Sequence, residues 1–279
     1  MDRLLLQSWL NHEERIKNPQ QALEMLVGVL ADPDPEIRDT LGYTIFTQLL
    51  AKTMWPKGVL SHMLSMLAND EHAMLDLGEK DAPSILRRSF SWLAIAALLE
   101  RDALDNAPDI NQSLLHGTVT QLGQYLSQEQ DWTGYHPNWG WVHAGAHTAD
   151  AAAALARHPN VSLQDQRRLA LMAGQFIVQP LVWNHEEMDR WAWVWFSLIE
   201  RHPDSSVMDD IFQLLSVHQE NRRGVQNVKA VLYPLYFLVR WSRTLSEHYR
   251  DLWLDRLERL IAMHDIFVAA GLTDGPTKI

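Results

Sequence analysis

The sequence Asp-Pro-Glu-Ile-Arg at Asp34–Arg38 is a strong helix-start signal in this chain. Aspartate followed by proline and glutamate is a typical helix start, because the aspartate side chain can accept a free backbone N–H and proline needs no hydrogen bond in the first turn. Apolar side chains then recur every four residues, at Leu41, Ile45 and Leu49. This spacing places them on one face, so a helix that buries this face is predicted over residues 35–52.

Similar signals recur along the chain. Apolar residues return at helical spacing almost throughout, whereas alternating β-branched runs joined by Asn-Gly or Asp-Gly turns are missing. Pro180, Pro203 and Pro234 divide the second half into segments of about one helix each. Helices are predicted at residues 3–16, 20–31, 35–52, 57–68, 83–103, 110–127, 139–157, 163–178, 187–201, 206–218, 225–242 and 246–269.

The short connections between these segments favour antiparallel neighbours. We therefore expect an all-α fold, a single domain over residues 1–279, in which antiparallel helix pairs stack into a HEAT-like α-solenoid. Residues 32–50 carry the HEAT resemblance, because an acidic turn and a following arginine precede the apolar positions of a helix. No internal period allows the repeats to be counted, so a compact irregular bundle is the alternative.

Charge and composition exclude several classes of function. The chain has 35 acidic and 24 basic side chains, and its formal net charge of −11 makes nucleic acid a poor partner. It has no cysteine, which excludes disulfides, thiolate metal sites and cysteine nucleophiles and fits a reducing cytoplasm. No apolar run approaches the ~20 residues that cross a bilayer, so we expect a cytoplasmic protein without a membrane partner.

Residues 131–195 differ from the rest of the chain, because they hold seven of its twelve tryptophans. A loop from 131 to 140 leads into the predicted helix 139–157, which is rich in alanine. His143, His147 and Asp150 are offset by four and seven residues, so they are predicted to share one polar face of this helix. Such a face can line a groove or lie buried against another helix.

Two functions fit this segment, and whether the protein is an enzyme stays open. The first is a non-enzymatic helical repeat protein that needs no cofactor and holds a protein or peptide ligand in a tryptophan-rich groove. The alternative is a hydrolase in which His143, His147 and Asp150 bind a divalent metal such as zinc, because histidines four residues apart can direct nitrogens at one ion.

A purely structural interpretation is also open. His147 and Asp150 would then hydrogen-bond to the helix that begins near Glu187, and the tryptophans would be core residues. Taken together, these interpretations give the candidate site Trp139, Trp141, His143, His147, Asp150, Glu187, Asp189 and Arg190.

The run Gly140–His143, followed by His147 and Asp150, resembles a bacterial family known as domain of unknown function 2785. The family pattern joins this run to an earlier Arg-Ser-Phe-Ser segment, present at 88–91, and to a later acidic-Arg-Leu-Ala motif, from which 189–192 departs. The resemblance spans residues 32–200 and brings no activity with it. It implies a helical, cytoplasmic bacterial protein with one constellation made of Arg88, His143, His147, Asp150 and Arg190.

Overall fold

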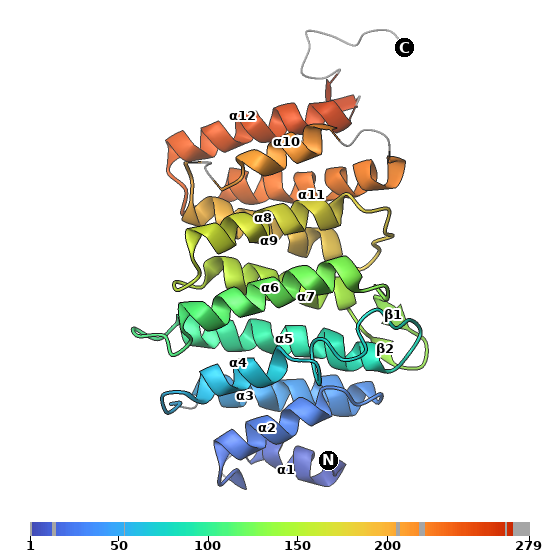
Figure 1. The fold of residues 1–279 in the computed structure, drawn as a ribbon, viewed down its shortest axis with the longest axis vertical. Helices are drawn as coiled ribbons and strands as arrows, with labels where there is room; N and C mark the ends of the chain where they lie inside the picture. The colour runs from blue at the N-terminus through green and yellow to red at the C-terminus, as the bar shows by residue number, and fades with distance from the viewer. Residues whose placement is uncertain are drawn as a thin grey trace. The chain divides into compact units, whose positions relative to one another are not determined.

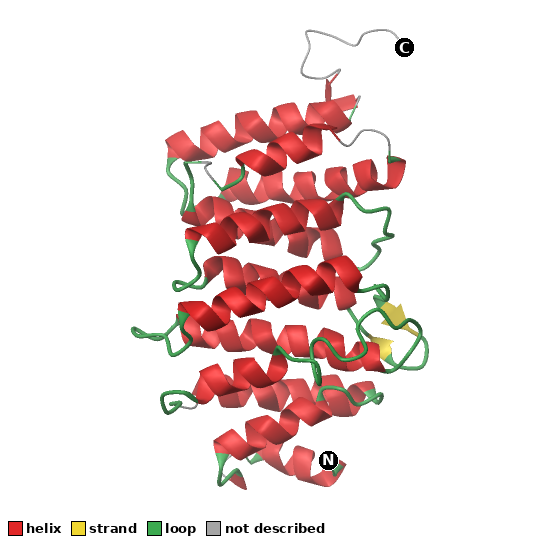
Figure 2. Cartoon of the chain, in the orientation of Figure 1, coloured by secondary structure: helices red, strands yellow, loops and turns green. Residues whose placement is uncertain are grey.

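The computed structural model describes residues 2–12, 15–52, 54–204, 207–217, 221–265 and 267–269. Helices account for nearly all of the regular structure in these residues, as Figure 1 and Figure 2 show. Two strands of two residues each are the exception. The prediction of an all-α fold is confirmed. The chain divides into two compact units, residues 1–162 and 163–279.

The first unit is built around two helices that pack along each other. Its elements are α1 (Arg3–Asn11), α2 (Pro19–Val29), the π-helix η2 (Glu36–Tyr43), α3 (Thr44–Lys52), α4 (Val59–Leu67), α5 (Ser84–Ala103), α6 (Gln112–Gln128), β1 (Tyr135–His136), β2 (Gly140–Trp141) and α7 (Ala144–Arg157). The central pair is α5 and α7. Helix α7 is buried along almost its whole length, and its alanine run at 151–154 lets α5 approach closely.

The helix predicted over 35–52 is present, but it has two parts. Its first part is the π-helix η2, which continues directly into α3. Asp34 accepts the backbone N–H of Glu36 at 2.9 Å, but Pro35 is the N-cap residue of η2, so the aspartate lies one position before the predicted cap. A π-helix widens the turn by one residue and often marks a functional position. Here it carries Arg38.

The helix predicted over 139–157 begins too early. Residues 135–136 and 140–141 form an antiparallel hairpin, and α7 starts only at Ala144. Gly140 has a φ of +71° and lies so close to Pro35 that a Cβ there would come within 3.3 Å. Glycine supplies both the left-handed backbone and the missing side chain, so the chain turns where a helix was expected.

His143 is therefore the residue before α7. Its φ of 52° is left-handed, a conformation that costs a non-glycine residue roughly 1–2 kcal/mol. The backbone N–H of His143 donates to the carbonyl of Gly134 at 3.0 Å, which helps to hold this conformation. The predicted helical face thus contains His147 and Asp150, whereas His143 approaches from the hairpin.

Several other predicted helices differ from the observed ones at their ends. The helix predicted at 3–16 ends at Asn11, and residues 13–14 lie outside the described residues. The helix predicted at 206–218 is α10 (Asp209–Val217), and residues 206 and 218 lie outside the described ranges. The helix predicted at 246–269 is α12 (Glu247–His264).

The second unit consists of α8 (Leu163–Ile177), α9 (Glu187–Arg201), α10, α11 (Arg222–Trp241) and α12. Helix α11 packs against both α9 and α12. The fully buried side chains of Trp191, Trp195 and Trp253 contribute large apolar surfaces to this core. In the described parts of the chain, no helix is both long and apolar enough to cross a membrane.

Asp102, near the end of α5, joins three segments of the first unit. Its carboxylate accepts the backbone N–H groups of Asp109 at 2.8 Å and Ile110 at 3.1 Å, and it lies 3.0 Å from Nε2 of His158. Burial raises the pKa of Asp102, but the hydrogen bonds from His158 and the two backbone groups outweigh burial and leave the pKa below its usual value.

The Asp102→Asn variant is expected to lose about 1–3 kcal/mol of unfolding free energy at pH 7, because an amide replaces a buried acceptor of several hydrogen bonds. A pKa that is lower in the folded state stabilises the fold above about pH 4, and this contribution is lost as the pH falls through the folded pKa. Urea unfolding at pH 7 and pH 3 should therefore show a smaller acid effect in the variant. An equal acid effect in both proteins would contradict this role.

Candidate functional site

The hairpin at residues 135–143, hereafter the aromatic hairpin, is the exposed part of the candidate site. Tyr135 is 51% exposed and Trp141 is 44% exposed, and their ring centroids lie 5.0 Å apart in an edge-on arrangement. His136 and Trp139 stack at 3.8 Å. Trp141 is therefore a surface residue and Trp139 is only partly buried, so the interpretation of the tryptophans as core residues is wrong for Trp141.

Arg38 holds the aromatic hairpin from inside the first unit. Its side chain is fully buried, and Nη2 donates to the carbonyls of Trp139 at 2.8 Å and Trp141 at 3.0 Å. Nη1 donates to the carbonyl of Asp32 at 3.0 Å, and the guanidinium lies 4.7 Å from the ring centre of Phe90. Arg38 of η2 thus holds the backbone of the hairpin by hydrogen bonds, while its guanidinium packs on the ring of Phe90 in α5.

Asp131 fixes the other end of this segment. One carboxylate oxygen accepts both the backbone N–H and the hydroxyl of Thr133, at 3.1 and 2.6 Å. The other oxygen accepts the backbone N–H of Asp81 at 3.1 Å. The aromatic hairpin is therefore held near its base and near its tip, which limits the conformational entropy that it can lose on binding.

A row of three rings leads from the hairpin into the unit. Trp141 and His143 are parallel within 2° at 4.5 Å, and the rings of His143 and His147 lie 5.5 Å apart. Nδ1 of His147 lies 2.9 Å from the hydroxyl of Ser89, which donates to the carbonyl of Val142 at 2.6 Å. A hydroxyl has one proton, so Nδ1 of His147 must be the donor, and in the neutral ring Nε2 keeps the lone pair.

Arg88 belongs to a different, buried network. Nε lies 2.5 Å from a carboxylate oxygen of Glu129, and both side chains are fully buried. The remaining nitrogens donate to the carbonyls of Leu75 at 2.9 Å and Glu79 at 3.0 Å, among others. The structure therefore places Arg88 with Glu129 and not with the histidines implied by the resemblance.

The other candidate residues lie on α7 and α9. Asp150 is partly buried on α7. In the second unit, the buried carboxylate of Glu187 accepts the backbone N–H of His185 at 2.7 Å, at the start of α9. Asp189 is exposed and Arg190 is partly buried on the first turns of the same helix. The predicted set is thus divided between the two units.

Within the residues that the structure describes, no group of three or more His, Asp or Glu side chains is placed to hold a metal ion. The pair His143 and His147, with Asp150, stays a prediction for a divalent metal such as zinc. A metal bound there would have to be held by Nε2 of His147, because Nδ1 lies 2.9 Å from the hydroxyl of Ser89.

Three residues of this region were not among the sequence candidates: Arg38, Ser89 and Glu129. Arg38 had a local signal, because it is the arginine of the Asp34–Arg38 motif. Ser89 lies inside the Arg-Ser-Phe-Ser segment, but nothing local shows that it faces a histidine 58 residues away. Glu129 stands between two glutamines and has no sequence signal of its own.

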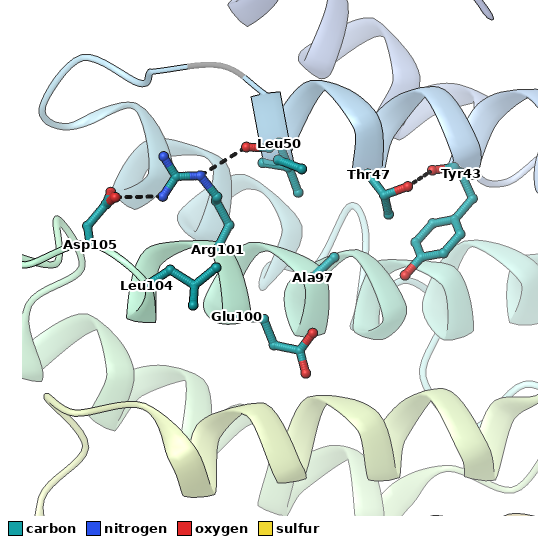
Figure 3. Close-up of a pocket in the computed structure, with 9 residues that line it drawn as sticks. Tyr43, Thr47, Leu50, Ala97, Glu100, Arg101, Leu104 and Asp105 are labelled. Carbon is teal, nitrogen blue, oxygen red and sulfur yellow. Dashed lines mark hydrogen bonds and ion pairs between the residues drawn. The ribbon is translucent and has the colours of Figure 1, made fainter.

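A hollow of the first unit, about 440 Å³, is lined by η2, α3, α5 and the residues that follow α5 (Figure 3). Its charged groups are already paired. Arg101 donates to the carbonyl of Leu50 at 3.0 Å and lies 2.7 Å from Asp105, and Glu100 lies 2.5 Å from Arg157. These pairings leave the hollow without an unpaired charge to select a ligand, and we assign it none.

A comparison with protein families matches residues 74–238 to the family described as "Protein of unknown function (DUF2785)". The matched range includes Arg88, the aromatic hairpin and α9, and it begins after residues 32–50, for which the sequence predicted a HEAT repeat. It also extends beyond residue 200, where the resemblance was expected to end. No curated protein and no solved structure matches the chain.

Proposed function

Because this chain belongs to the DUF2785 family, whose description names no activity, we propose a function from its own surface. The protein is a non-enzymatic helical repeat protein that binds a protein or peptide through its aromatic hairpin. The observation that carries this proposal is the exposure of Tyr135 and Trp141 on a backbone locked by buried Arg38. Rigid tyrosine and tryptophan side chains supply much of the binding energy at protein interfaces.

The proposal includes a HEAT-like stacking of the helix pairs and a place in the cytoplasm. The helix start at Asp34–Arg38, with its buried arginine, supports the first part. The absence of cysteine from the chain supports the second, because cysteine-free proteins need no oxidising compartment. In this proposal the protein binds its ligand without a cofactor.

The Trp141→Ala variant is expected to weaken binding at least tenfold, because a central tryptophan in an interface typically contributes about 2 kcal/mol or more. The ligand probes are peptides selected from a random display library on the wild-type protein, after removal of every peptide that binds Trp141→Ala. Dissociation constants of the surviving peptides are then measured by calorimetry for both proteins.

Trp241→Ala is the matched control, because Trp241 is 73% exposed but lies on α11 in the second unit. The control should bind the selected peptides as tightly as the wild type. Circular dichroism and melting curves should match for all three proteins, because both tryptophans are exposed. The proposal fails if no peptide survives the removal step, or if the two variants weaken binding equally.

A further inference from the structure

A second aromatic surface lies in the second unit, on the neighbouring helices α9 and α11. It is a groove of about 460 Å³, and its lining residues are Asp189, Trp193, Pro234, Phe237, Leu238 and Trp241. Pockets that hold small ligands are typically about 300–1,000 Å³. The groove is open to solvent and has room for one long side chain to lie along it.

Three aromatic rings of this groove face solvent. Trp193 is 40%, Phe237 46% and Trp241 73% exposed. The residues Phe237 and Trp241 are four apart on α11, and their ring centroids lie 5.1 Å from each other. On α9, by contrast, Trp191 and Trp195 are at most 1% exposed, so the helix buries two tryptophans and presents the one between them. Clustered aromatic exposure of this kind marks a binding surface.

A carboxylate stands beside these rings. Asp189 precedes Trp193 by one helical turn, is exposed, and has no hydrogen bond or ion pair among the described residues. Glu186, which is also exposed, precedes Asp189 by about another turn. The cations nearest in the sequence are Arg190, next to Asp189, and Arg240, next to Trp241. Each points about 100° around its helix from the neighbouring residue that lines the groove. The lining residues themselves carry negative charge only.

We propose that this groove binds an arginine or lysine side chain of a basic peptide segment. The cationic head lies against the faces of Trp193 and Trp241 and pairs with Asp189, and the aliphatic stem packs on Phe237. The negative faces of aromatic rings attract cations, and the planar guanidinium also stacks on them. The formal net charge of −11 adds a long-range attraction for a basic partner.

The test compares two peptides on the full-length protein by ¹⁹F NMR. The protein is labelled with 5-fluorotryptophan, and the signals of Trp193 and Trp241 are assigned with Trp→Phe variants. The probes are acetyl-Leu-Arg-Leu-amide and the same peptide with citrulline, which keeps the shape of arginine but has no charge. At low salt the arginine peptide is expected to bind about tenfold more tightly and to shift both assigned signals.

Asp189→Asn keeps the shape of the side chain and removes its charge. This variant is expected to reduce the preference for arginine from about tenfold to about threefold and to leave the citrulline affinity unchanged. Trp241→Ala is expected to weaken both peptides, because it removes a wall of the groove. Trp141→Ala is the matched control and should change neither affinity, which separates this site from the proposed function of the aromatic hairpin.

Four results would overturn the proposal. Equal affinity for the two peptides would make the groove an apolar site without selection for charge. Unchanged preference in Asp189→Asn would remove the carboxylate from recognition, and signal shifts at other tryptophans would place the peptide elsewhere. Shifts of the Trp193 and Trp241 signals on dilution without peptide would assign the groove to a second copy of the chain.

Discussion

Glu129→Gln is expected to lower the free energy of unfolding by about 3–5 kcal/mol, because it leaves the buried Arg88 without its counter-charge. Both side chains are fully buried, and the two groups meet at 2.5 Å. Glutamine has nearly the shape of glutamate, so the loss would come from charge and hydrogen bonding and not from a cavity. Urea unfolding followed by circular dichroism measures it.

Glu100→Gln is the matched control for this prediction. Glu100 makes the same kind of ion pair with Arg157 at 2.5 Å, but its side chain is 57% exposed. Exposed pairs contribute about 0–1 kcal/mol, so this variant should unfold almost like the wild type. The double variant Glu129→Gln/Arg88→Met should lose less unfolding free energy than the sum of the losses in the two single variants. Equal losses for Glu129→Gln and Glu100→Gln would contradict the buried ion pair.

Arg38→Met is expected to cost about 3 kcal/mol or more of unfolding free energy and to abolish binding at the aromatic hairpin. Methionine fills much of the arginine volume but donates no hydrogen bond, so the carbonyls of Trp139, Trp141 and Asp32 lose their common donor. Because the hairpin backbone is then no longer tied to η2, Trp141 is expected to become mobile. Hydrogen exchange at residues 135–143 and peptide affinity measure the two effects.

Arg3→Met is the matched control, since it makes the same substitution in an exposed arginine. Arg3 pairs with Glu36, and the two side chains are 43% and 52% exposed. This variant is expected to change stability by less than about 0.5 kcal/mol and to leave hairpin exchange unchanged. If Arg38→Met unfolds like the wild type but loses binding, the arginine acts on the hairpin alone. If hydrogen exchange at residues 135–143 is unchanged in Arg38→Met, Arg38 does not hold the aromatic hairpin in place.

The helices could be predicted because the signals that form them are local. The aspartate at position 34 and the apolar positions from Leu41 to Leu49 act within one or two turns, and the structure has helix there. The predicted helix start at residue 139 was wrong, because the chain makes a turn at Gly140. There the backbone is left-handed and packs closely against Pro35, which lies more than a hundred residues earlier in the chain. Helix periodicity cannot report such a contact.

The candidate site could be predicted only as a region. The tryptophan-rich segment at 131–195 does contain the aromatic hairpin and Trp193, but the sequence could not separate exposed tryptophans from buried ones. Trp191, Trp193 and Trp195 are alike in type and adjacent on α9, yet only Trp193 is substantially exposed. The rotation of a helix against its neighbours decides which of them is covered.

The all-α class, the approximate order of the helices and the membership of the DUF2785 family could all be inferred from the amino-acid sequence. These depend on hydrogen bonds and apolar spacing within about four residues along the chain. The partners of the two buried arginines became known only from the folded structure: Arg88 pairs with Glu129, 41 residues away, and Arg38 binds the carbonyl of Trp139, 101 residues away. A buried charged group must pair with a polar group that packing places beside it. Which group lies beside it depends on how the core folds, and residues near it in the sequence do not determine this.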